Sequence, residues 1–408
     1  MYIDVNIFCR QHHYIEVRQQ LDSQVEIENG VIRGFVEPGF ERVADAFERN
    51  FDGDELGAAF AVVHDGKSVV DLWGGLADPK NGLAWCSNTL QLIFSGTKGL
   101  VAGVVLMLID RGLIALDQPV SRYWPEFGKP EVLVRHIVTH GARLPGIESP
   151  ITNEEITNDR RMAALLAGQL PCSDPRAVHC YHPLTFGWLC GELIRRVSGR
   201  SVGTFFAEEI AAPLELELWI GLPEKEEDRV STLVLAPDWG ISAFLDPMTW
   251  AHDPLVQCVW GNPDHFTQDS FPWNRRAWHA AEIPGVNAIG TARAIAAFYG
   301  WLASGGKPLI SERTAALAHR PLADWVDAVH GGRRRTGVGF ELQNDLMPYG
   351  PPPEAFGHTG AGGSNHGAWP EQKVGYSYAM NLMHDNASND RRALTLLAAL
   401  HQALADHQ

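Results

Sequence analysis

Cysteine is scarce in this sequence, and the cysteines that occur are not paired in motifs. Six are present in 408 residues, and none forms a C-x-x-C pair. A disulfide scaffold has a far higher cysteine density, so that class of small secreted protein is excluded. We interpret the cysteines as buried or incidental thiols of a protein in a reducing compartment.

The sequence also lacks a long apolar run. The most apolar stretch, 100–109, ends at Asp110, and it is much shorter than the roughly 20 residues that span a bilayer. Residues 1–10 contain no basic segment followed by an apolar one, as a secretory signal would. These absences predict a protein with no membrane partner and a cytoplasmic location.

Positive charge is in deficit. Lysine and arginine total 33 against 49 acidic residues, a formal net charge of -16, which excludes nucleic acid as a natural partner. The one basic run, Arg333 to Arg335, is predicted to be a solvated loop. The 17 histidines include no H-E-x-x-H spacing, and no phosphate-binding loop follows a strand, so we expect neither a metal nor another cofactor.

Strand patterns occur near both ends of the chain, and helical patterns fill the middle. The clearest strand pair, 58–63 and 68–73, is joined through Asp65-Gly66, which is typical of a tight hairpin. Other predicted strands are 355–360, 364–369 and 374–383, and predicted helices are 183–197, 291–302 and one capped by Ser388.

This arrangement predicts an α/β protein in which both ends of the chain build one domain. We assign residues 31–110 and 285–408 to that α/β domain. Residues 111–284 are assigned to a mostly helical domain whose long loops wall a cleft. Residues 1–30 have no clear period and are expected to form an N-terminal extension. The catalytic cleft should lie where the two domains meet.

The motif that indicates chemistry is Ser95-Gly96-Thr97-Lys98. On a helix, residues i and i+3 share one face, so the lysine amine can reach the serine hydroxyl. A serine hydroxyl is a weak nucleophile until an adjacent base takes its proton, and lysine acts as a base only when burial lowers its pKa. The apolar flanks favour such a buried site over an N-cap serine followed by an exposed lysine.

With these flanks the sequence resembles the serine β-lactamase and penicillin-binding-protein superfamily, and within it the family VIII carboxylesterases. The resemblance extends from about Glu37 to Met383 and is carried by residues 58–75, 94–120, 123–127, 181–200, 283–292 and 356–364. It implies a serine β-lactamase-like fold, with an antiparallel sheet flanked by helices and a mostly helical insertion. It also implies that Ser95 is the nucleophile and Lys98 its base.

The second element of the family, a tyrosine opening a helix in Y-x-N, reads Tyr181-His182-Pro183 here. By resemblance, Tyr181 passes a proton between the catalytic pair and the leaving group, in a phenolate form favoured by a nearby ammonium. His182 is expected to contact substrate. The asparagine is replaced by Pro183, which suits a first helical position but offers no side-chain amide. Its loss weakens the lactamase interpretation more than the esterase one.

The third element, K-T-G on a strand, reads His358-Thr359-Gly360 here, and these residues are expected to bind substrate. By resemblance, the oxyanion hole is formed by the backbone N–H groups of Ser95 and Ala361. A lysine in the first position would hold a substrate carboxylate, whereas a histidine is mostly neutral near pH 7. The exchange therefore predicts a preference for uncharged acyl esters.

A second serine lies in a G-x-S-x-G pattern at Gly199 to Gly203. In α/β-hydrolases that pattern follows a strand, but here a predicted helix precedes it. We therefore predict that Gly199 ends one helix and that Ser201 caps the next.

These features predict a serine carboxylesterase that hydrolyses short- to medium-chain acyl esters through a Ser95 acyl-enzyme, with a small-molecule ester as its partner and no specified oligomeric state. The Trp- and Phe-rich segment 239–278 is expected to shape an apolar acyl pocket. The same nucleophile would also serve a β-lactamase, a D-aminopeptidase or amide hydrolase, or an acyltransferase. A non-catalytic member of the fold is the remaining alternative, and the intact Ser95, Lys98 and Tyr181 argue against it.

Overall fold

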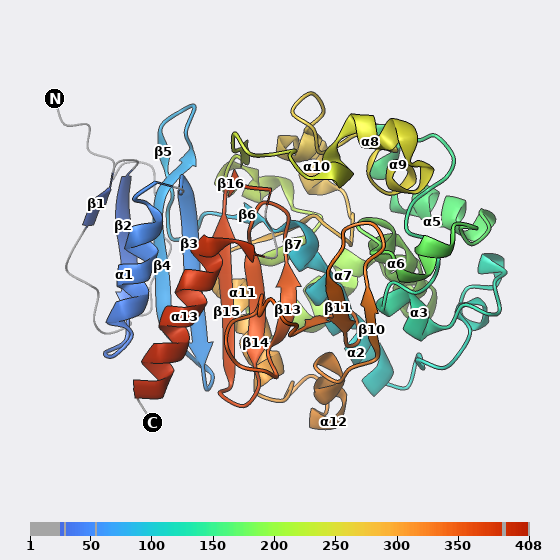
Figure 1. Ribbon diagram of the computed structural model, residues 1–408. Coiled ribbons are helices and arrows are strands. Elements are labelled where there is room, and N and C mark those ends of the chain that lie inside the picture. Colours follow the sequence, from blue (N-terminus) through green and yellow to red (C-terminus); the bar gives the residue numbers. More distant parts are fainter. Residues whose placement is uncertain (1–24, 28–29, 54, 386–388, 407–408) are drawn as a thin grey trace.

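Strands from both ends of the chain form one large antiparallel sheet (Figure 1). The computed structural model describes residues 25–27, 30–53, 55–385 and 389–406. From one edge to the other, the described strands are β1 (Val25–Ile27), β2 (Gly30–Val36), β4 (Lys67–Asp78), β3 (Gly57–His64), β15 (Val374–Met380), β14 (Asn365–Trp369), β13 (Phe356–Thr359), β12 (Glu341–Leu342), β11 (Arg333–Thr336) and β10 (Ala323–Val326), with β5 (Leu83–Ala84) paired to β4.

The turn between β3 and β4 has the backbone that its sequence predicts. Asp65 has φ 47° and Gly66 has φ 77°, so both central residues are left-handed. The predicted strands 355–360, 364–369 and 374–383 correspond to β13, β14 and β15, and their first and last residues agree to within three positions. The alternation and turn signals were therefore sufficient to locate these strands.

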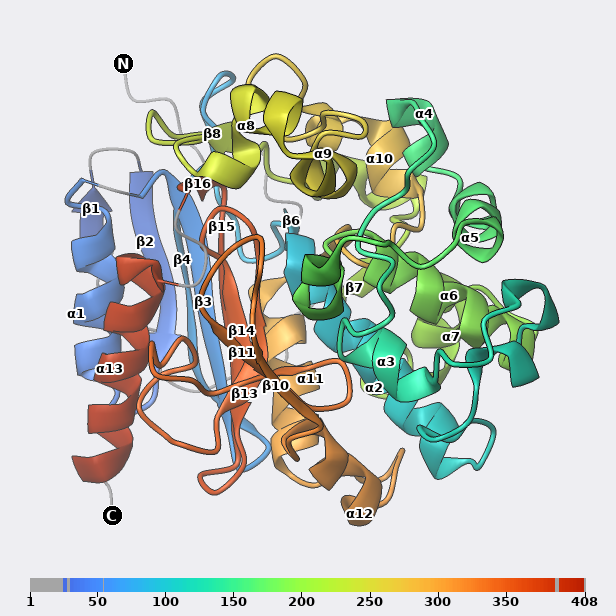
Figure 2. The same ribbon diagram turned by 45° about the vertical axis from the view of Figure 1, so that its right-hand side comes forward.

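Helices cover both faces of the sheet (Figure 2). On one face, α1 (Glu41–Asn50) and α13 (Arg391–Asp406) pack against each other and bury Val43, Phe47 and Leu397 over the strands. On the other face, α11 (Ala292–Ala303) packs against β3, β14 and β15. This confirms the predicted fold class of an antiparallel sheet flanked by helices.

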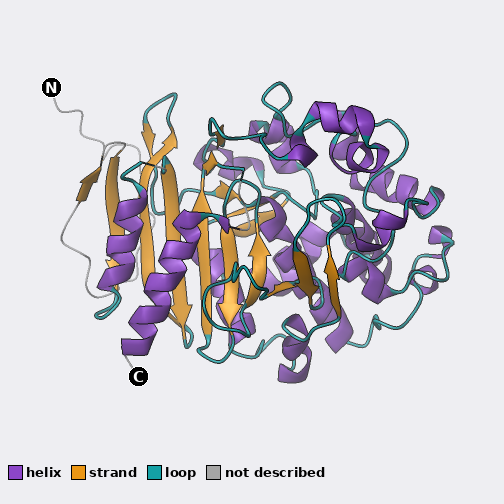
Figure 3. Ribbon diagram, viewed as in Figure 1, coloured by secondary structure: helices purple, strands orange, loops and turns teal. Residues whose placement is uncertain are grey.

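The rest of the described chain is mostly helical and lies to the right of the sheet in Figure 3. Its helices are α2 (Thr97–Asp110), α3 (Val134–Val138), α4 (Asn153–Ile156), α5 (Asp159–Gly168), α6 (Thr185–Ser198), α7 (Val202–Phe206), α8 (Pro247–His252), α9 (Pro254–Trp260), α10 (Arg276–Ala280) and α12 (Glu312–Ala315). Short strands complete it: β6 (Gln91–Leu92), β9 (Ala288–Gly290) and β7 (Leu218–Ile220) form one small sheet, and β8 (Val234–Leu235) pairs with β16 (Leu382–Met383).

Helix α2 is apolar on all sides because it is enclosed on all sides. Its residues from Thr97 to Leu108 are all buried, and it packs against α6 and α7 on one side and β13 on another. It therefore lies between the large sheet and the helical part of the molecule, with its N-terminal end carrying the S-x-x-K motif.

Four local predictions were wrong or fall wholly or partly outside the described residues. The run Arg333 to Arg335 belongs to strand β11 and is not a loop. Helix α6 begins at Thr185, two residues later than the predicted start at Pro183. Ser388, the predicted cap of the last helix, lies outside the described residues, as do 1–24 and 28–29 of the predicted N-terminal extension, whereas 25–27 form β1. The domain boundaries stay predictions.

The cysteines differ in state. Cys172, Cys180, Cys190 and Cys258 are free thiols, and the middle two of these are buried. Cys86 is disulfide-bonded, so the prediction of thiols is wrong at this position. Cys9 lies outside the described residues. The cytoplasmic location stays a prediction.

Within the described residues, no helix combines the length and apolar composition needed to cross a membrane. The same part of the chain has no group of three or more His, Cys, Asp or Glu side chains placed to hold a metal ion.

Candidate active site

Ser95 lies in a tight turn between β6 and α2. The turn, Phe94–Gly96, is a single 3-10 turn, and Phe94 in it has φ 45°. A non-glycine residue in the left-handed region costs on the order of 1–3 kcal/mol. The ring of Phe94 is buried 5.5 Å from that of Phe266 and 5.2 Å from that of Trp273. This aromatic packing holds the strained turn and so fixes the position of the Ser95 hydroxyl.

Lys98 is the base candidate that the motif predicts. Its side chain is fully buried, and its Nζ lies 3.1 Å from Ser95 Oγ. The same nitrogen donates to the carbonyl oxygens of Pro183 at 2.7 Å and Gly285 at 2.8 Å. Burial holds the pKa of Lys98 well below its ordinary value. An amine in this state has a lone pair that can take the serine proton.

Tyr181 completes the group around Ser95. Its hydroxyl donates to Ser95 Oγ at 3.0 Å, and Lys98 Nζ lies 4.9 Å from the centre of its ring. Burial raises the pKa of Tyr181, so the resting hydroxyl is protonated. The sequence predicts a phenolate stabilised by a nearby ammonium. Burial instead favours the uncharged amine of Lys98, so the ammonium that would stabilise a phenolate is disfavoured.

Main-chain carbonyl groups take the place of the missing asparagine side chain. Because α6 begins only at Thr185, the carbonyl of Pro183 is available to accept from Lys98. The carbonyl of Gly285 accepts a second hydrogen of the same amine. Two main-chain oxygens thus hold the lysine in place where the related proteins are expected to use a side-chain amide.

His182 has a different environment from the one predicted for a substrate contact. It is fully buried, with Nδ1 2.8 Å from the carbonyl of Cys180, while Nε2 accepts from the N–H of Leu144 at 3.3 Å. Burial lowers its pKa to about 4. Both ring nitrogens are therefore used by the backbone, and neither is available to a substrate.

The end of β13 lies directly beside the nucleophile turn. Gly360 packs so closely on the carbonyl of Ile93 that a Cβ would collide with it, which explains the glycine. His358 and Thr359 are buried on the same strand, and Ala361 follows as a partly exposed residue. The structure thus brings the second and third motifs to Ser95.

His358 is uncharged in this environment. Its Nδ1 lies 2.8 Å from the carbonyl of Thr359, and its Nε2 is buried without a partner among the described residues. Burial lowers its pKa to about 4. This position therefore carries no positive charge near neutral pH, as the exchange of lysine for histidine predicts.

Ser201 has a structural role at the start of α7. Its hydroxyl accepts from the N–H of Thr204 at 3.2 Å as the N-cap of α7, and it donates to Glu282 at 2.6 Å. Helix α6 precedes it, and Gly199 has φ 74° at the end of that helix. The predicted cap assignments are confirmed.

The Trp-rich segment contributes mainly to the core. Trp239, Trp250 and Trp273 are buried, and each indole N–H donates to a main-chain carbonyl, at 2.6, 2.8 and 2.8 Å respectively. Trp273 also supports Phe94 next to the nucleophile. Whether the segment shapes an acyl pocket stays a prediction.

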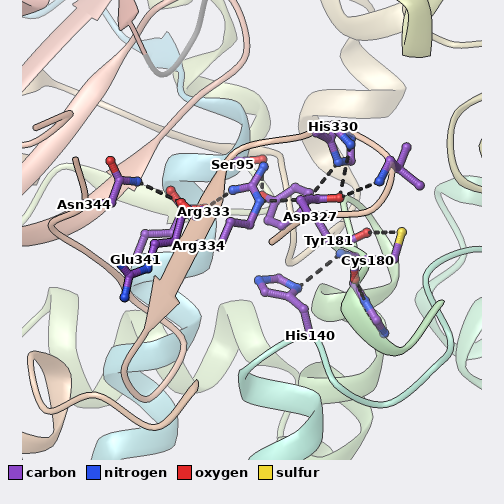
Figure 4. A network of polar contacts seen from close by, with 12 residues as sticks. Ser95, His140, Cys180, Tyr181, Asp327, His330, Arg333, Arg334, Glu341 and Asn344 are labelled. Atoms are coloured by element: carbon purple, nitrogen blue, oxygen red, sulfur yellow. Dashed lines mark hydrogen bonds and ion pairs between the residues drawn. The ribbon is translucent and has the colours of Figure 1, made fainter. Parts of the chain in front are cut away.

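Sequence reasoning missed a charged network beside Tyr181, seen in Figure 4. Arg334 on β11 pairs with Asp327 and with Glu341 on β12, and His330 pairs with the same aspartate. The signal that could have revealed this network is the alternation of side-chain directions along a strand. Three charged residues in a strand cannot all face solvent, because successive side chains point to opposite faces.

Residues 33–401 of the chain match the Beta-lactamase family model. The chain belongs to the beta-lactamase family. This confirms the resemblance predicted from the motifs, and it covers both the sheet and the helical part. Within the family, the chain is 33% identical over 375 residues to the Esterase/beta-lactamase LipL of Mycobacterium tuberculosis, covering 85% of this chain and 82% of that protein.

Solved structures of other relatives have the same fold. A crystal structure of a family VIII carboxylesterase aligns with TM-score 0.83 at 37% identity, covering 91% of this chain and 99% of that one. A penicillin-binding protein homolog from Caulobacter crescentus aligns with TM-score 0.80 at 35% identity, with the same coverage. One of these relatives is named for ester hydrolysis and the other for penicillin binding. The residues of the site must therefore indicate which kind of substrate this protein takes.

Proposed function

We propose that this protein is a serine hydrolase with carboxylesterase activity, and that the reaction proceeds through an acyl-enzyme on Ser95. The observation that carries the proposal is the buried amine of Lys98, 3.1 Å from the Ser95 hydroxyl and held by two main-chain carbonyls. The relatives named esterase and carboxylesterase support the same reaction class.

In the first half of the reaction, Ser95 Oγ attacks the ester carbonyl carbon while its proton moves to Lys98 Nζ. The negative charge that forms on the carbonyl oxygen is stabilised by the N–H groups of Ser95 and Ala361, which contribute on the order of 3 kcal/mol each. The alcohol then leaves with the proton of the Tyr181 hydroxyl, and Tyr181 regains a proton from the Lys98 ammonium.

In the second half, water attacks the acyl-enzyme carbonyl and gives a proton to the same Lys98–Tyr181 pair. The carbon–Oγ bond breaks, Ser95 Oγ recovers its proton, and the carboxylic acid is released. The ester, one water molecule and the side chains of Ser95, Lys98 and Tyr181 account for every proton that moves in these steps.

The substrate class that fits best is an uncharged acyl ester. His358 is neutral at the position where a lysine would bind a carboxylate, because burial lowers its pKa to about 4. Short- to medium-chain esters are proposed because apolar side chains surround the nucleophile turn.

The proposal is tested by hydrolysis of p-nitrophenyl butyrate by wild type, Ser95→Ala and Ser201→Ala. We expect the wild type to hydrolyse the ester and Ser95→Ala to show only background activity. Ser201→Ala should be nearly as active as the wild type, because it loses a helix cap worth about 1 kcal/mol and a hydrogen bond to Glu282 but no group beside Ser95. Equal activity of wild type and Ser95→Ala would exclude Ser95 as the nucleophile. An inactive wild type would favour amide substrates or a non-catalytic role.

Two other reactions use the same nucleophile and need separate assays. Hydrolysis of a chromogenic cephalosporin in preference to the ester would favour a β-lactamase, consistent with the double name of the Mycobacterium tuberculosis relative. Ester products formed after addition of an acceptor alcohol would indicate acyl transfer.

A further inference from the structure

Arg334 lies over the ring of Tyr181. Its guanidinium carbon is 4.3 Å from the ring centre, on a side chain that is 19% exposed. Lys98 Nζ is 4.9 Å from the same ring centre. The ring of the proton-relay candidate thus lies close to one amine and one guanidinium, and the guanidinium is always charged.

The guanidinium is held in place by two carboxylates. Its Nε donates to Asp327 Oδ2 at 2.8 Å, and its Nη1 pairs with Glu341. Asp327 is itself fixed, because its Oδ1 accepts the N–H groups of Val329 and His330 at 3.0 and 3.1 Å. Such a doubly anchored planar group keeps one orientation, which a flexible lysine would not.

Hydrogen bonds further from Tyr181 fix His330 and Glu341. His330 Nδ1 lies 2.9 Å from Asp327 Oδ2, and its Nε2 accepts from the indole N–H of Trp260 at 2.9 Å. Glu341 Oε2 accepts from the hydroxyl of Tyr349 at 2.8 Å. The network therefore reaches from α9 through the β10–β11 turn to β12. Its inner end is Arg334, which lies beside Tyr181 (Figure 4).

This geometry excludes one role for Arg334 and favours another. Two carboxylates already pair with its guanidinium, so it is a poor receptor for a substrate carboxylate. Its guanidinium carbon still lies over the ring of Tyr181, and a cation in that position interacts more strongly with an electron-rich phenolate than with a phenol. The charge also disfavours an ammonium on Lys98.

Building on the proposed function, we propose that Arg334 is a positioning residue for proton transfer, which orients the Tyr181 ring and whose charge favours the proton-accepting forms of Tyr181 and Lys98. It provides the site with a fixed cation from β11, while position 358 on β13 carries a neutral histidine. Glu341 opposes this effect on both groups and Asp327 opposes it on Tyr181, because a negative charge favours the protonated forms.

The charged and titratable groups facing Arg334 and Tyr181 come from every element packed around them. They are Lys98 of α2, His140 just after α3, Asp327 and His330 of the β10–β11 turn, Glu341 of β12 and His358 of β13. Burial lowers the pKa of each of the three histidines, so near neutral pH Arg334, Asp327 and Glu341 are the charged members.

The experiment compares pH profiles of kcat/KM for p-nitrophenyl butyrate between about pH 5.5 and 9. For Arg334→Gln we expect up to about a 10-fold loss at pH 6 that becomes smaller toward pH 9, because the base now needs a higher pH to lose its proton. The acid limb should move up by about one pH unit. Glu341→Gln should move the limb down, and Arg334→Lys should restore it in part.

Arg333→Gln is the matched control. Arg333 is the neighbour on the opposite face of β11, its side chain is 50% exposed, and it pairs with Asp324, so its profile should match wild type. An Arg334→Gln deficit that is equal at every pH, with Glu341→Gln shifting nothing, would make Arg334 merely structural and overturn the inference. Ester hydrolysis that survives in Ser95→Ala would instead overturn the proposed function itself.

Discussion

At the residue scale, the chemistry depends on an amine without a carboxylate partner. Lys98 is buried, and the oxygens within hydrogen-bond distance of its Nζ, among the described residues, belong to one hydroxyl and two main-chain carbonyls. A buried ammonium without a counter-ion is costly, so the amine responds by releasing its proton. Burial is thus the main cause that converts a common surface cation into a base.

Tyr181→Phe tests the relay at this scale. Among the described residues, Ser95 is the only hydrogen-bond partner of the Tyr181 hydroxyl, so the variant should lose activity but not its fold. We expect kcat to fall by about 10²- to 10⁴-fold with KM little changed. Steady-state kinetics and a thermal melt check this, and a variant with wild-type kcat would contradict the relay.

At the element scale, the loop after β13 is held by the first turn of α13. Gly362 and Gly363 have φ 89° and 116°, so the loop takes a path that other residues rarely adopt. Arg392 donates to the carbonyl of Gly362 at 3.0 Å and to Asp390 at 2.7 Å. A helix close to the end of the chain therefore sets the position of Ala361, the proposed oxyanion donor.

Arg392→Met is expected to loosen this loop and lower kcat for p-nitrophenyl butyrate by about 10- to 100-fold, since losing one oxyanion donor costs up to about 10³-fold. The exposed neighbour variant Arg391→Met should behave as wild type. Arg392→Lys keeps the charge and should recover part of the rate. Full activity of a folded Arg392→Met protein would show that the loop does not need this support.

At the scale of the whole molecule, the two ends of the chain are joined around a buried acid. Strand β3 pairs with β15, α1 packs on α13, and Glu55 lies between these halves in contact with Tyr378 and Arg392. Burial raises the pKa of Glu55 from 4.5 to about 7, although Arg392 and Tyr378 act in the opposite direction. The junction of the two halves is therefore sensitive to pH.

The sign of that sensitivity follows from linkage. The folded protein binds this proton more tightly than the unfolded chain, so the stabilisation is fully present below about pH 4.5 and is lost as the pH rises through about 7. It amounts to about 3 kcal/mol. Glu55→Gln should flatten the decline in unfolding free energy between pH 5 and 8. Urea unfolding at several pH values measures this, and parallel curves for the two proteins would contradict it.

The sequence by itself determined the features that depend on neighbours in the chain. The β3–β4 hairpin follows from Asp65-Gly66, and the Ser95–Lys98 contact follows from the i, i+3 spacing. Gly199 and Ser201 were assigned correctly because capping is a local hydrogen-bonding requirement. Such interactions need only a few residues and the preferences of the backbone.

Only the tertiary structure decided what surrounds the catalytic pair. The carbonyls that hold Lys98 come from Pro183 and Gly285, 85 and 187 residues away, and backbone oxygens leave no mark in a sequence. The placement of Arg334 over the ring of Tyr181 required β11 to pack beside the site, and a basic run looks the same whether it is solvated or buried. Burial and charge environment depend on which distant segments meet, and they set the proton affinities on which the chemistry depends.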